Sequence, residues 1–201
     1  MNLKPIPLSF YHTSDVQGVA RDLLGKILIT CFEDRTTAVR IVETEAYNGE
    51  VDRASHAFGR RYTPRTKVMY EAGGLAYVYL CYGLHQMFNV VAGEENNPLA
   101  ILVRAGEPLE GSSTMLERRK MKLITPALTN GPGKLASALA LHTRHSGMPL
   151  NSENLFIADD GYRLKKDELG ISPRIGVDYA GDDALLPYRY FIRGNSFVGK
   201  F

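Results

Sequence analysis

The order of apolar and polar positions along the chain predicts short strands separated by a few helices. Residues 13–24 carry apolar side chains at helical spacing, and Thr13 or Ser14 can cap their first turn. Two strand-like apolar runs follow at 26–32 and 38–47, joined by a short polar turn. This order is typical of a helix followed by an antiparallel β-hairpin.

The remainder of the chain repeats the same kinds of segment. Further strands are expected at 75–82, 86–92, 100–105, 155–158, 174–177 and 188–193, and helices at 111–120 and 131–141. Residues 48–65 are irregular and polar, and a long loop of this kind within a compact domain is often functional. Closely spaced strands with few helices favour an α+β fold, as a single mixed domain over residues 1–201 with a mainly antiparallel sheet.

The composition indicates a globular protein without export or membrane signals. The 201 residues are 44% apolar, enough for a sizeable core, but no apolar run reaches the roughly 18 residues of a membrane span. The N-terminus lacks the apolar region and cleavage site of a signal peptide. Cys31 and Cys81 are expected to be buried reduced thiols, too few for a disulfide framework. These features predict a cytosolic protein.

The formal net charge is only +2, but the positive charges are clustered. One cluster comprises Arg60, Arg61, Arg65 and Lys67, and another comprises Arg118, Arg119, Lys120 and Lys122. Such clusters are usually solvated surface, yet two of them on one small domain also fit a footprint on a phosphate backbone. No histidine or cysteine spacing matches a metal site, so neither a metal nor a cofactor is expected.

Residues 40–47, RIVETEAY, place two carboxylates on one predicted strand. Because alternate residues of a strand share a face, Glu43 and Glu45 are expected to point the same way, together with Tyr47. A buried carboxylate has to be paired or to serve in chemistry. Two interpretations therefore stay open here: ion pairs with nearby arginines, or a reactive carboxylate at the wall of a pocket.

Residues 75–89 carry three tyrosines in different positions. Tyr77 and Tyr79 share one strand face, and Tyr77 is expected to pack in the core. Tyr82 stands at the strand end, directly before Gly83, where the chain has to turn. A planar side chain at a turn suits wedging between base pairs, and one on a pocket wall suits stacking on a base.

Taken in order, these segments resemble the alkyladenine (3-methyladenine) DNA glycosylase family. The matching stretches are RIVETEAY, His56, TPR at 63–65, YVYLCYG at 77–83, Asn89, LVRAGEPLEG at 102–111, GPGKLASALA at 131–140 and YFIRG at 190–194. The resemblance runs from about residue 9 to the C-terminus. It implies a curved antiparallel sheet flanked by helices, and hydrolytic removal of altered purines with neither a metal nor a lysine Schiff base.

The resemblance also implies catalytic roles. Glu45 corresponds to the general base that activates the attacking water, and Arg104 to the residue that anchors this water and the nearby backbone. Tyr82 corresponds to the wedge that fills the gap left by a flipped nucleotide. Glu43 matches the motif, but a supporting role is expected of it.

Four further residues correspond to the base-binding pocket of the family. Tyr47, His56 and Tyr79 match the walls that contact the flipped base, and Asn89 matches the residue that excludes the exocyclic amino group of guanine. The segment 83–88 departs from the family pattern, which leaves its minor-groove contacts open. The acid that protonates a neutral leaving base also stays open, with pocket water and a protonated His56 as two candidates.

The expected function is that of a monofunctional DNA glycosylase, a hydrolase without lyase activity. It would flip purines such as 3-methyladenine, 7-methylguanine, hypoxanthine or ethenoadenine out of duplex DNA and leave an abasic site for base-excision repair. Its partner would be double-stranded DNA with a damaged purine, with no membrane involved, and a monomer would suffice. It would act on the nucleoid in a bacterial cytoplasm, or in a eukaryotic nucleus.

Two other functions are weighed against this one. A noncatalytic nucleic-acid-binding module is the alternative, because exposed tyrosines and basic loops on a sheet can hold single strands. A sugar hydrolase with paired carboxylates is disfavoured. Glu43 and Glu45 would lie on one side of the scissile bond, whereas the carboxylates of glycosidases flank it.

Overall fold

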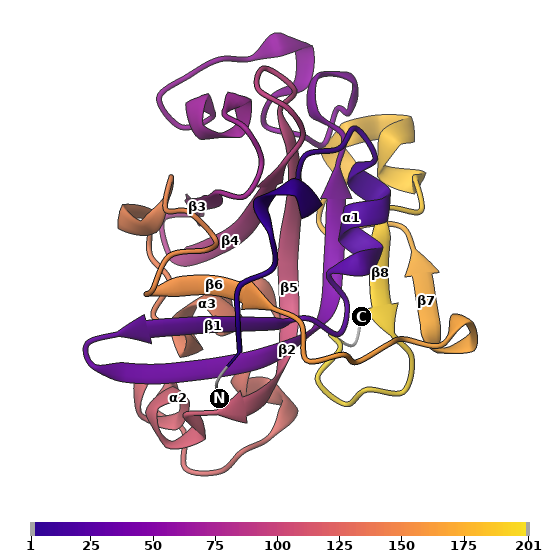
Figure 1. The fold of residues 1–201 in the computed structure, drawn as a ribbon. Helices are drawn as coiled ribbons and strands as arrows, with labels where there is room; N and C mark the ends of the chain where they lie inside the picture. The colour runs from indigo at the N-terminus through magenta and orange to yellow at the C-terminus, as the bar shows by residue number, and fades with distance from the viewer. Residues whose placement is uncertain (1–2, 200–201) are drawn as a thin grey trace.

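The computed structural model describes residues 3–199, whose eight strands form one sheet (Figure 1). The strands are β1 (Ile27–Phe32), β2 (Arg35–Tyr47), β3 (Ala76–Cys81), β4 (His85–Ala92), β5 (Leu99–Glu110), β6 (Leu155–Ala158), β7 (Leu169–Ser172) and β8 (Arg189–Ile192). Neighbours follow the order β3-β4-β5-β2-β1-β6, and β8 pairs with both β2 and β7. All these pairings are antiparallel, so the predicted α+β fold with a curved antiparallel sheet is confirmed.

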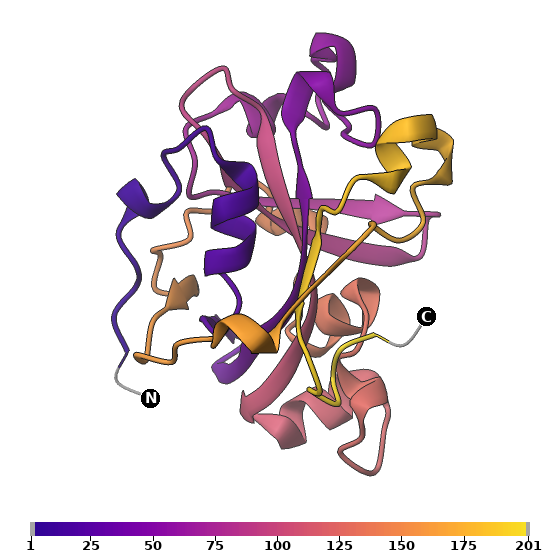
Figure 2. The same cartoon turned by 90° about the vertical axis from the view of Figure 1, so that its right-hand side faces the viewer.

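Three α-helices of the described chain pack against this sheet. α1 (Val16–Asp22) lies on β2, where the Thr44 hydroxyl donates to the carbonyl of Ala20 at 2.8 Å. α2 (Ser112–Arg119) and α3 (Pro132–Ala138) contact each other, and α3 also packs on β4 and β5. Figure 2 shows the strands between α1 and the α2–α3 pair. Apolar side chains of all three helices join those of the strands in the main core.

β2 organises the candidate site because different strands flank its two halves. β5 pairs with one edge of β2 from Ala38 to Tyr47. The other edge pairs with β1 in its first half and with β8 at Glu43, Thr44 and Glu45 in its second half. Glu43 lies opposite Phe191 of β8, and Glu45 lies between Leu102 of β5 and Arg189 of β8. Register shifts interrupt the β2–β5 ladder on either side of Glu43. Carboxylates placed here depend on polar partners from neighbouring elements.

The segment between β2 and β3 is a long loop with short 3-10 turns at Gly49–Val51, Phe58–Arg60 and Lys67–Tyr70. Both views place the first part of this loop at the same end of the molecule as the 3-10 segment Asp178–Leu185 (Figures 1 and 2). The Tyr179 hydroxyl donates to the carbonyl of Ala54 at 3.1 Å and joins the two segments. Two distant parts of the chain therefore build one end of the molecule.

The first helix is shorter than predicted. α1 begins at Val16 rather than at residue 13, and its N-cap is Asp15 instead of Thr13 or Ser14. The physical reason is that the Asp15 carboxylate accepts a backbone N–H of the first turn at 2.8 Å. The predicted helix therefore exists, but its start was placed too early.

The strand predicted at 174–177 is wrong, because the strand that pairs with β8 lies earlier, at β7. Gly176 has φ +74°, a left-handed conformation that interrupts an extended chain. Arg174 is drawn into a buried ion pair instead. β5 also differs from its prediction, since it runs beyond residue 105 and keeps pairing with β2 as far as Glu110.

Cys31 and Cys81 are free thiols, but both are half-buried rather than buried as predicted. Each lies close to the turn end of its hairpin strand, where packing is incomplete. Within residues 3–199, no helix is long and apolar enough to cross a membrane. The same part of the chain contains no group of three or more His, Cys, Asp or Glu side chains that could hold a metal ion.

Candidate active site

Glu43 and Glu45 lie on the same face of β2, where Arg104 of β5 bridges them. The Arg104 Nε donates to Glu43 Oε1 at 3.0 Å, and its Nη1 lies 3.2 Å from Glu45 Oε1. Both carboxylates have no exposed surface, and Arg104 is 6% exposed. The ion-pair interpretation therefore holds for both carboxylates, and any reactivity of one of them has to arise within this network.

Glu45 receives further hydrogen bonds on both carboxylate oxygens. The Ile175 backbone N–H donates to Oε1 and the Tyr47 hydroxyl donates to Oε2, each at 2.9 Å. Burial raises the pKa of Glu45, while Arg104 and these two hydrogen bonds oppose that rise. A carboxylate whose pKa is raised accepts a proton more readily than an exposed one, which suits a general base.

Glu43 ties several elements together. Besides Arg104, it accepts a hydrogen bond at 2.7 Å from the Nε of Arg189 on β8. The backbone N–H of Gly199, near the end of the chain, donates to its other oxygen at 2.9 Å. Glu43 therefore connects Arg104 to β8 and to Gly199, and in this way it supports the position of Arg104 beside Glu45.

A hollow of about 730 Å³ opens beside these charges, a size typical of small-molecule sites. Tyr47, His56 and Tyr79 all line it, so the structure brings together the three predicted walls. The His56 and Tyr79 rings meet edge to face, with centroids 4.6 Å apart and planes at 80°. The Arg65 guanidinium lies 4.6 Å from the centre of the Tyr79 ring. The lining thus offers aromatic surface with a positive charge at its edge.

Glu45 lies directly behind the wall of this hollow. Tyr47, Arg104 and Ile175 each line the hollow and each contact Glu45. The carboxylate itself has no exposed surface in this structure. A water molecule inside the hollow therefore contacts this carboxylate only if one of these three wall residues moves.

His56 is held between two polar partners. Its Nδ1 lies 2.8 Å from the Tyr77 hydroxyl, and its Nε2 lies 3.0 Å from Nη2 of Arg65. Burial, together with the charges of Arg65 and Arg61, lowers the pKa of His56 to about 4. The ring is therefore neutral near pH 7. These surroundings disfavour a protonated His56 as the acid, one of the two candidates left open by the sequence.

Asn89 lies in the lining with its amide fixed by the backbone. Its Nδ2 donates to the carbonyl of Tyr77 at 3.1 Å and to that of Met87 at 3.3 Å. The residue is 3% exposed and lines the hollow. A substituent of a bound base that points at Asn89 would therefore meet a rigid polar group.

Tyr82 stands at the tip of the β3–β4 hairpin, on the rim of the hollow. The three-residue turn is closed by a hydrogen bond from the Leu84 N–H to the Cys81 carbonyl at 3.0 Å. Tyr82 and Gly83 have φ values of +50° and +71°, which bends the chain sharply. The Tyr82 side chain is 90% exposed, so it is free to enter a partner molecule.

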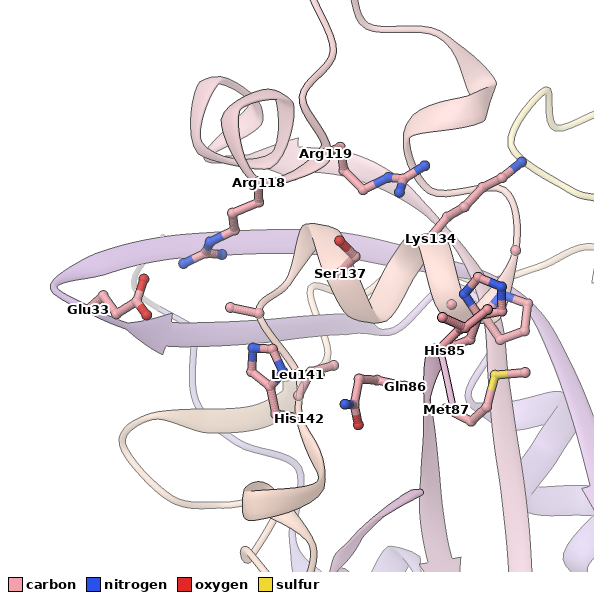
Figure 3. A pocket seen from close by; sticks show the side chains of 15 residues that line it. Glu33, His85, Gln86, Met87, Arg118, Arg119, Lys134, Ser137, Leu141 and His142 are labelled. Atoms are coloured by element: carbon pink, nitrogen blue, oxygen red, sulfur yellow. The ribbon is translucent and has the colours of Figure 1, made fainter. Parts of the chain in front are cut away.

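A second hollow of about 740 Å³ adjoins the first at this hairpin, since Met87 and Pro132 line both (Figure 3). The cations Arg118, Arg119 and Lys134 surround it. Each of the two basic clusters in the sequence thus contributes two arginines to the lining of one hollow. Arg61 and Arg65 line the first, and Arg118 and Arg119 line the second. Arg60, Lys67, Lys120 and Lys122 are not among the lining residues.

Several residues of the site were not identified from the sequence. Tyr77 is buried as expected, but its hydroxyl also contacts His56. Ile175 contributes a backbone N–H, which no residue type reveals. The buried pair of Asp52 and Arg174 joins positions 122 residues apart. The only sequence signal for it is an arginine close to apolar residues.

Comparison with known proteins shows that nearly the whole chain is similar to DNA glycosylases that act on methylated purines. The sequence profile described as "Methylpurine-DNA glycosylase (MPG)" matches residues 9–196. A relative from Chlamydia felis, named "Putative 3-methyladenine DNA glycosylase", is 42% identical over 188 residues, covering 93% of this chain and 95% of its own. Relatives of the same name from Desulfitobacterium hafniense and Bacillus licheniformis are 40% and 41% identical; each match covers 98% of this chain, and 98% and 97% of the respective relative.

Proposed function

Because the chain belongs to the methylpurine-DNA glycosylase family, we propose that it excises alkylated or deaminated purines from duplex DNA and leaves an abasic site. The substrates proposed are 3-methyladenine, 7-methylguanine, hypoxanthine and ethenoadenine. The observation that carries this proposal is the buried Glu45 carboxylate directly behind the wall of an aromatic-lined hollow.

The reaction proposed is hydrolysis of the N-glycosidic bond through an oxocarbenium-like sugar. Once a wall residue moves aside, a water beside Tyr47 and Arg104 contacts the Glu45 carboxylate. It gives a proton to Glu45 while its oxygen bonds to C1′ of the sugar. The electron pair of the broken bond leaves with the base. The negative charge of Glu45 also stabilises the positive charge that develops on the sugar. The activating group is a carboxylate and no lysine takes part, so no lyase step is proposed.

Base flipping supplies the hollow with its substrate. Extrusion of a nucleotide costs a few kcal/mol of pairing and stacking. Stacking on aromatic side chains returns about 1–3 kcal/mol per base, and Tyr47, His56 and Tyr79 offer such surfaces. Tyr82 fills the vacated place in the duplex. Because these terms are similar in size, lesions that weaken base pairing are extruded most easily.

Selection against normal guanine falls to Asn89. Its amide is fixed by two backbone carbonyls and cannot turn away without losing those bonds. The 2-amino group of guanine would meet this fixed amide, whereas adenine-derived bases and hypoxanthine carry no amino group at that position. 7-Methylguanine carries the same 2-amino group, and its excision is proposed to rely on the ready departure of its cationic base.

The DNA backbone is proposed to run past the hairpin, between the cations at the two hollows. Arg61 and Arg65 lie on one side of Tyr82, and Arg119 and Lys134 lie at the hollow beyond it. Phosphate contacts from such side chains supply much of the affinity of DNA-binding proteins. One chain carries all these groups, so a monomer is proposed to act alone.

The test is single-turnover excision on duplexes that carry one hypoxanthine, ethenoadenine or 7-methylguanine, with Glu45→Gln beside the wild type. The wild type should produce alkali-dependent strand breaks. The variant should excise about 10²–10⁴-fold more slowly, the usual contribution of a general base, and bind lesion DNA equally well. An active variant would refute the role of Glu45. Tight binding by the wild type without strand breaks would favour a noncatalytic binding module.

A further inference from the structure

A buried ion pair lies behind the base pocket, between the loop after β2 and the segment before β8. The side chains of Arg174 and Asp52 are 0% and 1% exposed. The pair is bidentate, because Nη1 of Arg174 donates to Oδ2 of Asp52 and Nη2 donates to Oδ1 at 2.8 Å. Two parallel bonds of this kind fix both direction and distance.

Each partner also organises its own surroundings. Asp52 accepts the backbone N–H of Asn48 at 2.9 Å and that of Ala54 at 3.0 Å, which shapes the loop that leads to His56. Arg174 donates to the carbonyl of Ala46 at 2.9 Å. It also donates to the carbonyl of Asp183 at 3.0 Å. The pair therefore connects the end of β2, the following loop and the 3-10 segment.

This pair touches two parts of the candidate site. The Arg174 guanidinium lies 4.8 Å from the centre of the Tyr47 ring. The next residue, Ile175, gives its backbone N–H to Glu45 at 2.9 Å. The residues after it, Gly176 and Val177, line the hollow. A displacement of Arg174 would therefore move the Tyr47 ring at the pocket wall and weaken the hydrogen bond from Ile175 to Glu45.

We propose that Asp52 and Arg174 are positioning residues for base excision. They hold the backbone N–H of Ile175 against Glu45 and the Tyr47 ring against the flipped purine. This inference rests on the proposed function. The competing reading is a pair that contributes only to stability. The two readings differ in what they predict for the protonation of Glu45.

Asp52 affects the pKa of Glu45 in two opposite ways, through its own negative charge and through the hydrogen bond that it helps to position. Among the described residues, the ionisable groups that face Glu45 or its partners include Arg104, Glu43, Tyr47, Tyr79, Arg174, Arg189 and Asp52. Removing the negative charge of Asp52 would by itself lower the pKa of Glu45. Loss of the Ile175 hydrogen bond would raise that pKa, because this bond stabilises the charged form.

The experiment is a carbon-13 NMR titration of the Glu45 carboxyl in Asp52→Asn and in the double variant D52N/R174Q, with Glu45→Gln assigning the signal. The double variant leaves no unpaired buried charge, so it is used if the single variant fails to fold. Loss of the Arg174 charge raises the Glu45 pKa by itself, so in the double variant the amide proton shift of Ile175 against pH reports the hydrogen bond to Glu45. Asp160→Asn is the matched control, because Asp160 and Arg40 form a bidentate pair away from the site. Excision rates against pH are measured on the same proteins.

The proposal predicts a higher Glu45 pKa in Asp52→Asn, loss of the pH-dependent Ile175 amide shift in the double variant, and a single-turnover excision rate about tenfold or more below wild type at pH 7 in both. The Asp160→Asn control should match wild type in both respects. An unchanged or lowered Glu45 pKa, with an excision profile that overlays wild type, would overturn the positioning role. If the wild type itself excises nothing, the proposed function fails, while the titration still tests the link to Glu45.

Discussion

At Glu45, burial and hydrogen bonding act on the same carboxyl in opposite directions. Burial makes the charge costly, and Arg104, Ile175 and Tyr47 retain it. A fully satisfied carboxylate would be inert and an unpaired one would be protonated at neutral pH. The arrangement lies between these extremes, which is the condition under which a buried glutamate can take a proton from water.

The raised pKa of Glu45 leads to a prediction about pH. As the proposed base, Glu45 would act only when deprotonated. The excision rate should therefore be low at pH values below its raised pKa and rise as the pH passes through that pKa. The acid limb should therefore lie above about 4.3, the ordinary glutamate value. This profile is best measured on a 7-methylguanine duplex, because its cationic base needs no protonation before it leaves.

The control for this profile is Glu45→Gln, whose residual excision should lose the acid limb. A limb that persists in the variant, or that lies at the ordinary glutamate value in wild type, would assign the titration to another group.

At the scale of elements, the β3–β4 hairpin exposes Tyr82 at its tip, where the side chain does not pack in the core. The residue is 90% exposed and adopts a left-handed φ of +50°, which an asparagine or glycine would adopt more easily. A large exposed aromatic at such a position contributes little to folding. Its presence is better explained by contact with a partner.

Replacement of Tyr82 by serine should therefore reduce flipping more than stability. We expect the flipped fraction of an ethenoadenine or 2-aminopurine duplex, measured by fluorescence, to fall about five- to a hundredfold, since one stacking contact is worth about 1–3 kcal/mol. The thermal midpoint should stay within a few degrees of wild type.

Tyr62→Ser is the matched control, because Tyr62 is 66% exposed and is not among the residues that line either hollow. An unchanged flipping equilibrium in Tyr82→Ser, or an equal loss in both variants, would remove the wedge role.

The hairpin and β2 also show what the sequence could predict. The alternation of RIVETEAY placed Glu43 and Glu45 on one face, and Gly83 marked the turn after Tyr82, because both follow from local geometry. The contact of Arg174 with Asp52 depends on the path of the chain between them, and the Ile175 contact uses backbone alone. Local pattern contains no information about such contacts, and this also explains the wrong strand at 174–177.

At the scale of the whole molecule, the two hollows and the hairpin between them form one surface with positive charge on both sides. The net charge of only +2 does not reveal it, because Glu33 is the only acidic residue of the described chain that lines either hollow. Local concentration of cations, rather than the total, is what attracts a phosphate backbone.

Lys134→Ala tests this surface cleanly. Lys134 is exposed and donates a hydrogen bond to Oδ1 of Asn130 at 2.9 Å, whereas Arg119 donates to the Leu128 carbonyl and so also supports the fold. Binding to lesion and undamaged duplexes should weaken by a similar factor, and the slope of log affinity against log salt should fall by about 1. Excision at saturating protein should not change.

Lys166→Ala, on the 3-10 turn before β7 and outside the lining of both hollows, is the control. A loss confined to lesion DNA, or an unchanged salt slope, would show that Lys134 does not contact phosphate.

Several partners of Glu43 and Glu45 come from the C-terminal part of the sequence. Arg189 and Gly199 reach Glu43 over separations of 146 and 156 residues, and Ile175 reaches Glu45 over 130. Contacts of such high sequence separation form slowly in folding, because long loops have to close first. Recovery of excision during refolding should therefore lag behind recovery of secondary structure, and activity would report the last step at which the two ends of the chain meet.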